Sequence, residues 1–144
     1  MIDWTTEFGI FTDQRLKKEE VIWLTTVTKD GVAQPNPIWF YWDGEVITIY
    51  SQPGSYRIRN IQHNPRVTLN LEGADVLGNN VVVIQGEAQL NSYQQPKAGY
   101  REKYFNYITQ IGMTYDQLVT DYSVEITITP AKLRGTLKYQ YAPE

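Results

Sequence analysis

Residues 46–71 contain basic side chains and no acidic ones. The basic residues in this segment are Arg57, Arg59, His63 and Arg66. Three neutral hydrogen-bond donors precede or accompany them: Ser51, Gln52 and Ser55. Guanidinium groups and hydroxyls bind phosphate oxygens, and the start of a helix adds free backbone N–H groups. The segment therefore predicts a phosphate site, while an ordinary solvated helix face with surface arginines is the alternative.

A second feature is a run of prolines and aromatic residues, QPNPIWFYW, at residues 34–42. Pro35 and Pro37 remove two backbone donors, which places this strand at the edge of a sheet. Four consecutive aromatic residues suit a core or a dimer surface. They equally suit a slot for a planar ligand such as an isoalloxazine ring, which needs apolar walls and a few backbone groups at its edge.

Several common kinds of site are excluded by the sequence. The motifs G-x-G-x-x-G, G-x-x-x-x-G-K-[ST], G-x-S-x-G and H-E-x-x-H are absent. There is no cysteine and His63 is the only histidine, so disulfides, thiolate chemistry and a multi-histidine metal site are excluded. His63 ends a short predicted helix, where interaction with the helix carboxyl end is a simpler role than catalysis.

The length of 144 residues suits one compact domain spanning 1–144. The net charge is -3 at pH 7, from 13 basic and 16 acidic residues, so no overall attraction to nucleic acid or to an anionic membrane is expected. The first residues are too polar for a secretory signal, and a cytoplasmic protein is expected.

The elements that position these residues are mainly strands. Alternating apolar residues predict six strands, at 21–28, 32–41, 45–51, 66–71, 81–90 and 122–129, with Pro130 ending the last. Helices are expected at 12–20, 56–62 and 95–111, and a brief one capped by Thr114 at 114–119. The fold class is mainly β with peripheral helices, as a closed or nearly closed six-stranded antiparallel barrel, because closure removes exposed strand edges.

Three stretches carry a family resemblance: WLTTVTKDG (23–31), PNPIWFYWDG (35–44) and ITIYSQPGSYRIRNIQHNPRVTLNL (47–71). Their order and spacing resemble the FMN-binding split-barrel proteins related to pyridoxamine 5'-phosphate oxidase, and most closely a subgroup predicted to use a deazaflavin. The later VVVIQGEAQL (81–90), IGMTYDQ (111–117) and YSVEITITPAKLRG (122–135) fit the same subgroup. The resemblance covers nearly the whole chain.

The resemblance implies a homodimer with two cofactor sites at its interface, binding FMN or the deazaflavin coenzyme F420. Residues along the ring would be Asn36, Pro37, Ile38 and Trp39. Residues flanking the ribityl chain would be Ile49, Tyr50, Ser51 and Gln52. Phosphate ligands would be Ser51, Ser55, Arg57 and Arg59. Candidates from the second subunit are Asn79, Asn80 and Gln85.

The implied activity is that of an oxidoreductase moving a hydride between the bound cofactor and a small organic substrate. This scheme requires no side-chain acid or base, and the aromatic candidates on the substrate side are Tyr41, Trp42 and Tyr139. Arg57 stands where many relatives carry lysine, which keeps the charge and alters the donor geometry. The Arg-rich carboxyl-terminal signature of true pyridoxamine phosphate oxidases is missing, so vitamin B6 oxidation is not expected.

Other functions stay open on the sequence alone. A non-catalytic carrier of a flavin or tetrapyrrole would have the same pocket. An oligonucleotide-binding barrel with aromatic stacking platforms is disfavoured by the acidic balance. FMN and the deazaflavin share a ring, a ribityl chain and a phosphate, but the longer acidic tail of the deazaflavin needs further cations. Candidates for these cations are Lys132, Arg134 and Lys138.

Overall fold

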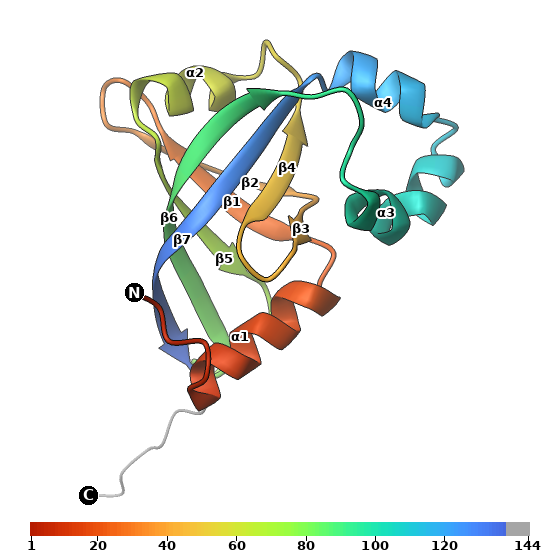
Figure 1. Ribbon diagram of the computed structural model, residues 1–144. Helices are drawn as coiled ribbons and strands as arrows, with labels where there is room; N and C mark the ends of the chain where they lie inside the picture. Colours follow the sequence, from red (N-terminus) through yellow and green to blue (C-terminus); the bar gives the residue numbers. More distant parts are fainter. Residues whose placement is uncertain (138–144) are drawn as a thin grey trace, which may run out of the picture.

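The computed structural model describes residues 1–137, which form seven strands and four helices (Figure 1). The strands are β1 (Ile22–Val27), β2 (Ala33–Ile38), β3 (Tyr41–Trp42), β4 (Ile47–Ser51), β5 (Arg66–Leu71), β6 (Val81–Ser92) and β7 (Val124–Thr136). The helices are α1 (Glu7–Lys18), α2 (Tyr56–His63), α3 (Ala98–Gln110) and α4 (Tyr115–Asp121). The β-rich class with peripheral helices is confirmed.

All seven strands belong to one antiparallel sheet in the order β2-β1-β5-β6-β7-β4-β3. The two edge strands, β2 and β3, follow each other in the chain with only Trp39 and Phe40 between them. Three residue steps span at most about 11 Å, so the two edges of the sheet must meet at this corner. The sheet therefore curls into a split barrel whose seam is joined by the chain itself instead of by ladder hydrogen bonds (Figure 1).

The corner explains why the strand count differs from the predicted six. The single strand predicted at 32–41 is two strands, because the chain leaves the β1 ladder after Ile38 and joins β4 at Tyr41. Pro35 and Pro37 lie in β2, which pairs with β1 alone. The edge position predicted from the two prolines is confirmed, since an edge strand tolerates missing N–H donors.

The prediction that Pro130 ends the last strand is wrong. β7 continues to Thr136 alongside β6, with an irregular register: Pro130 faces Gly86 and Lys132 faces Gln85. Ala131 is thus an extra residue on β7, and a bulge accommodates a proline that cannot donate to the ladder. The pairing of β7 with β4 runs no further than Ile128, so Pro130 lies where β7 has one neighbour.

Two helices cover the two ends of the barrel (Figure 1). Leu16 of α1 and Ile58 and Ile61 of α2 join the apolar interior formed by the strands. α1 begins at Glu7, five residues before the predicted start, because Thr6 accepts a hydrogen bond from the Gly9 N–H at 2.9 Å and caps the helix. α2 coincides with its prediction to within one residue.

α3 and α4 form a hairpin on the outside of the barrel, beside β3 and β4 (Figure 1). α4 starts with a capping box between Thr114 and Gln117, as expected from Thr114. The hairpin packs through a separate apolar cluster that includes Tyr50 of β4. Every residue of β4 is therefore buried, with the barrel interior on one side and the hairpin on the other. No helix in residues 1–137 is long and apolar enough to span a membrane.

Candidate functional site

A cavity of about 310 Å³ lies between the barrel and the α3–α4 hairpin. Its lining residues are Pro37, Ile38, Trp39, Tyr50, Arg57, Tyr100, Ile111, Met113, Leu118 and Tyr122. The volume falls at the lower end of the range typical of ligand pockets. The walls are apolar and aromatic, and Arg57 supplies the one charged side chain in the lining.

The corner between β2 and β3 forms one wall and is held by α3. The Trp39 indole stacks on the Tyr104 ring, with centroids 4.6 Å apart and planes inclined by 7°. The Tyr104 hydroxyl accepts from the Phe40 N–H at 2.8 Å and has the carbonyls of Glu20 and Phe40 within donating distance, at 2.7 and 2.8 Å. Lys103 Nζ donates to the same Phe40 carbonyl at 2.9 Å. These bonds fix the peptide next to Trp39 and thereby the indole that faces the cavity.

The wall contributed by β4 is the side chain of Tyr50. Its hydroxyl donates to Glu125 Oε2 at 3.0 Å and accepts from the Lys97 N–H at 2.8 Å. Its ring meets the Tyr100 ring edge to face, with centroids 4.7 Å apart. Burial raises the pKa of both phenols, so they are neutral at physiological pH.

Hydroxyl groups gather around Arg57. Ser51 is fully buried, and its Oγ lies 3.0 Å from Ser55 Oγ. Arg57 Nη1 donates to Ser51 Oγ at 3.3 Å. Ser55 is the N-cap of α2, yet its side chain makes no capping bond, and the first turn of the helix contains no acidic residue. Two hydroxyls, a guanidinium and a helix amino terminus therefore converge beside the cavity, a donor set suited to a phosphate group.

The two arginines of α2 differ in placement. Arg57 is half-buried and lines the cavity, whereas Arg59 is exposed and donates to the Gly54 carbonyl at 3.3 Å. The ion pairs found within residues 1–137 join Arg15 to Glu19, Lys17 to Asp13 and Lys97 to Asp43. Neither arginine of α2 is thus paired with a carboxylate in the part of the chain that the structure describes.

The other predicted site residues lie around this cavity at different depths. Asn36 is half-buried in β2 opposite Leu24, and Gln52 is exposed in the loop before α2. Ile49 is 1 % exposed and packs in the barrel interior, so its backbone alone is in a position to reach a ligand. His63 is exposed in the last turn of α2 and does not line the cavity.

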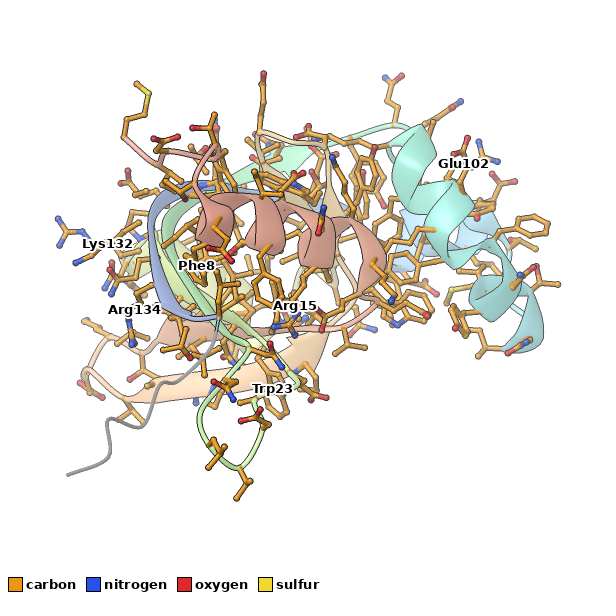
Figure 2. All side chains as sticks on the ribbon, turned by 90° about the horizontal axis from the view of Figure 1, so that it is seen from below. Phe8, Arg15, Trp23, Glu102, Lys132 and Arg134 are labelled. Carbon is orange, nitrogen blue, oxygen red and sulfur yellow. The ribbon has the colours of Figure 1, made fainter. Side chains whose placement is uncertain are left out.

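The predicted substrate-side aromatic residues have structural contacts elsewhere. Trp42 is buried, donates to Asp13 Oδ1 at 2.7 Å and packs against Trp4. Tyr41 packs directly over Gly99, where its ring leaves no space for a Cβ. Tyr139 and Lys138 lie outside the described residues. Lys132 and Arg134 project together from β7 on the side of the barrel away from Glu102 of α3 (Figure 2).

Half of the lining residues were not among the predicted site residues: Tyr100, Ile111, Met113, Leu118 and Tyr122. They belong to the α3–α4 hairpin or to its ends. Tyr100, Tyr104 and Tyr107 fall at helical spacing and predict a helix with an aromatic face, but helical spacing does not reveal which surface a helix covers.

The residues present fit a flavin-type cofactor in its chemistry. Such a molecule combines a planar ring with a phosphate, and the cavity combines aromatic walls with the hydroxyl and guanidinium donors at Ser51, Ser55 and Arg57. No charged group other than Arg57 lines the cavity, which agrees with an uncharged ring in its apolar part.

Comparison with known proteins connects the fold to a family. The sequence pattern of the family described as pyridoxamine 5'-phosphate oxidase matches residues 11–136. No curated protein matches the chain significantly.

Similar solved structures share the fold at low sequence identity. An F420 reductase is 22% identical with a TM-score of 0.62, over 85% of this chain and 94% of that one. The conserved hypothetical protein Rv2991 from Mycobacterium tuberculosis is 20% identical with a TM-score of 0.69, over 97% and 93%. HutZ, a heme storage protein from Vibrio cholerae, is 14% identical with a TM-score of 0.62, over 93% and 95%.

A reductase and a heme storage protein differ in function, so at this identity the similar structures establish the fold alone. The match over residues 11–136 extends across all seven strands and both walls of the cavity. The chain belongs to the pyridoxamine 5'-phosphate oxidase family.

Proposed function

We propose that this protein is an oxidoreductase that binds FMN, or alternatively the deazaflavin coenzyme F420, in the cavity between the barrel and the α3–α4 hairpin. The cofactor phosphate binds at Ser51, Ser55 and Arg57, and the ring extends along Pro37, Ile38 and Trp39. The substrate is a small organic molecule that exchanges a hydride with the ring.

One observation carries this proposal: a pair of hydroxyls, one buried and one half-buried, and an arginine without a carboxylate partner among residues 1–137 adjoin an aromatic cavity. Ser51 Oγ, Ser55 Oγ and Arg57 Nη1 are linked at 3.0 and 3.3 Å, and Arg57 itself lines the cavity. A buried or half-buried guanidinium is stable when an anion accepts its hydrogen bonds. A ligand with a phosphate at one end and a planar apolar body matches both the hydroxyl and guanidinium donors and the aromatic cavity.

When bound, the cofactor supplies the hydride chemistry through its central ring. The protein's residues bind, orient and shield it. Arg57 and the two serines fix the phosphate, Trp39 gives the ring a flat surface, and the apolar side chains of Met113 and Leu118 keep water away. The lining contains neither a carboxylate nor a histidine, so the proposal gives no side chain the role of proton donor.

A second candidate is a non-catalytic carrier of a flavin or a tetrapyrrole. Its support is that a heme storage protein has the same fold and that the lining contains neither a carboxylate nor a histidine. For a heme with a histidine ligand, the chain offers only His63, which is exposed outside the cavity. The flavin version of the carrier is therefore the stronger competitor.

The proposal includes a homodimer. A hollow of about 460 Å³ lies on the outer face of the barrel, where Thr25, Thr68, Gln85 and Lys132 lie on four neighbouring strands. Two threonines and an amide, with Lys132 at the end of the row, suit contact with a second copy. Analytical ultracentrifugation of the protein and of Thr68→Glu tests this: a dimer that the variant dissociates supports the face, and a monomeric wild type rejects the dimer.

The function is tested by titrating the cofactor-free protein with FMN and with F420 while following fluorescence. Micromolar or tighter binding of one of them is expected. Stopped-flow mixing of the loaded protein with a reductant and a panel of small acceptors then separates enzyme from carrier, since a carrier binds without turnover. Failure of both cofactors to bind rejects the proposed function.

A further inference from the structure

We propose that Tyr50 is a redox-active residue, which gives one electron to a light-excited flavin ring in the cavity while its phenolic proton moves to Glu125. This inference rests on the proposed function, because it needs a flavin in that cavity. It adds an activity that hydride transfer does not require: controlled one-electron oxidation of the protein at a defined side chain.

The first support is a continuous series of aromatic rings that starts at the cavity wall. Neighbouring centroids are 4.6 Å apart for Trp39 and Tyr104, 4.8 Å for Tyr104 and Tyr100, 4.7 Å for Tyr100 and Tyr50, and 4.6 Å for Tyr50 and Tyr93. Tyrosine and tryptophan are the side chains that lose an electron most easily. Electron tunnelling falls steeply with distance, so rings in contact exchange an electron far faster than separated ones.

The second support is the position of three of these rings against the cavity. Trp39, Tyr50 and Tyr100 all line it, so an isoalloxazine there lies beside potential donors from both walls. Tyr50 is 5 % exposed and Tyr100 is 3 % exposed, which keeps solvent away from the radical that would form.

The third support decides which ring retains the oxidation. An oxidised phenol is a very strong acid, so a tyrosine holds a radical only where its proton has an acceptor. Tyr50 donates to the Glu125 carboxylate at 3.0 Å. Tyr93 donates to the Tyr122 carbonyl at 2.6 Å, and the carbonyls near Tyr104 Oη belong to the backbone as well. A backbone carbonyl is too weak a base to take this proton, whereas a carboxylate is basic enough to accept it from an oxidised phenol.

Tyr107 extends the same series of aromatic rings from Trp39 to the protein surface. Its ring centroid lies 6.1 Å from that of Trp39, and it is exposed. A nearby Glu20 carboxylate raises the pKa of its phenol. Trp39 therefore contacts the exposed Tyr107 on one side and connects through Tyr104 and Tyr100 to the buried Tyr50 on the other.

The electron and proton balance is closed within the site. Tyr50 loses one electron to the excited ring and one proton to Glu125, which leaves a neutral tyrosyl radical and a carboxylic acid. Return of the electron from the ring and of the proton from Glu125 restores the starting state. No further oxidant is needed, because the light-excited flavin is itself the oxidant.

The test uses FMN-loaded full-length protein, with FMN occupancy measured separately by equilibrium dialysis. Under blue light we expect a short flavin fluorescence lifetime and a tyrosyl signal by electron paramagnetic resonance. Tyr50→Phe should lengthen the lifetime several-fold and remove most of the signal. Tyr115→Phe, a half-buried phenol outside the series, should leave both unchanged. Glu125→Gln keeps the shape of the acceptor but not its basicity, and should lower the radical yield.

The outcomes separate this inference from the proposed function. If FMN binds equally to wild type and Tyr50→Phe but both show the same lifetime and signal, the redox role of Tyr50 is rejected while the cofactor site stands. If FMN and F420 both fail to bind, the proposed function is rejected and this inference with it. A circular dichroism spectrum of each variant guards against misfolding, and Glu125→Gln gives an independent reading should Tyr50→Phe fold poorly.

Discussion

Arg57 Nη1 donates to Ser51 Oγ at 3.3 Å, and no carboxylate among residues 1–137 forms an ion pair with this arginine. A long hydrogen bond to a neutral hydroxyl is weak compensation for a half-buried guanidinium. The same group is within reach of any anion that enters the cavity. This relationship is the basis for expecting that Arg57 contributes more to cofactor binding than any other basic residue of the segment.

Arg57→Ala should weaken FMN binding by about tenfold to one hundredfold, because a hydrogen bond to a charged group contributes about 1.5 to 3 kcal/mol. Arg57→Lys should lose less FMN affinity than Arg57→Ala, since lysine keeps the charge but not the bidentate donor geometry. Fluorescence titration measures both. Lys18→Ala, which removes one exposed charge from the end of α1, is the matched control. Equal affinities for wild type and Arg57→Ala would contradict the phosphate site.

Arg59→Ala should change FMN affinity by at most about fivefold, because exposed charges contribute little. Its guanidinium is exposed and bonded to the Gly54 carbonyl instead of facing the cavity. The same titration measures it. A loss as large as that of Arg57→Ala would mean that Arg59 turns toward the phosphate when the cofactor binds, and that both arginines are ligands.

Much of the candidate site could be predicted from the amino-acid sequence. The segment without acidic residues around Arg57 predicted a phosphate site, and the proline and aromatic run before Trp39 predicted a slot for a planar ligand. The fold brings these two features to one cavity. The far wall could not be located, because apolar spacing at 95–111 predicts a helix with a buried face but not the element it packs against. Tyr100 and Met113 line the cavity through tertiary packing that no local pattern encodes.

The fold was predictable where local signals acted alone. Alternation and turn residues located most strands, and the residues around 56–62 defined α2 to within one position. The start of α1 was misplaced although its Thr6 cap is a local signal, but two other errors fall where tertiary context decides. A bulge lets β7 pass through Pro130, and the barrel corner splits one predicted strand at Trp39 and Phe40. The bulge and the corner both depend on which neighbouring strand pairs with the segment, and local sequence does not specify that strand.

Gly86→Ala should destabilise the fold by about 1 to 3 kcal/mol, the usual cost of overpacking. A Cβ at Gly86 would lie 2.6 Å from the Thr129 carbonyl oxygen, next to the bulge. Gly54→Ala is the matched control, since nothing lies within 4 Å of its Cβ, and should change stability by no more than about 0.5 kcal/mol. Urea unfolding compares the two. Similar midpoints for both variants would show that the strands at the bulge can separate without cost.

Tyr104→Phe should cost about 1 to 3 kcal/mol of stability, because it leaves the buried Phe40 N–H without its partner. It should also loosen the corner that holds Trp39. Tyr115→Phe removes an exposed hydroxyl that donates to the Arg101 carbonyl, and should cost about 0.5 kcal/mol or less. Guanidinium unfolding gives the stabilities, and near-ultraviolet circular dichroism reports the indole. Unchanged stability in Tyr104→Phe would contradict the role given to this hydroxyl.

Lys103 should make the stability depend on pH in a defined direction. Burial lowers its pKa in the folded protein from 10.5 to about 8. Below pH 8 the amine is charged in both states, and the cost of burying the charge is present in full. Between pH 8 and 10.5 the folded protein releases the proton while the unfolded chain still holds it, so the unfolded state binds more protons and stability rises with pH.

The tyrosines oppose this trend at higher pH. Burial raises the pKa of Tyr50, Tyr100 and Tyr104 above the ordinary value of 10. Above about pH 10 the unfolded chain loses phenolic protons that the folded protein keeps, so stability falls. Urea unfolding from about pH 7 to 11 should therefore show a rise and then a fall. In Lys103→Met the rise should be reduced and the fall should remain; a rise of the same size in the variant would show that another group causes it.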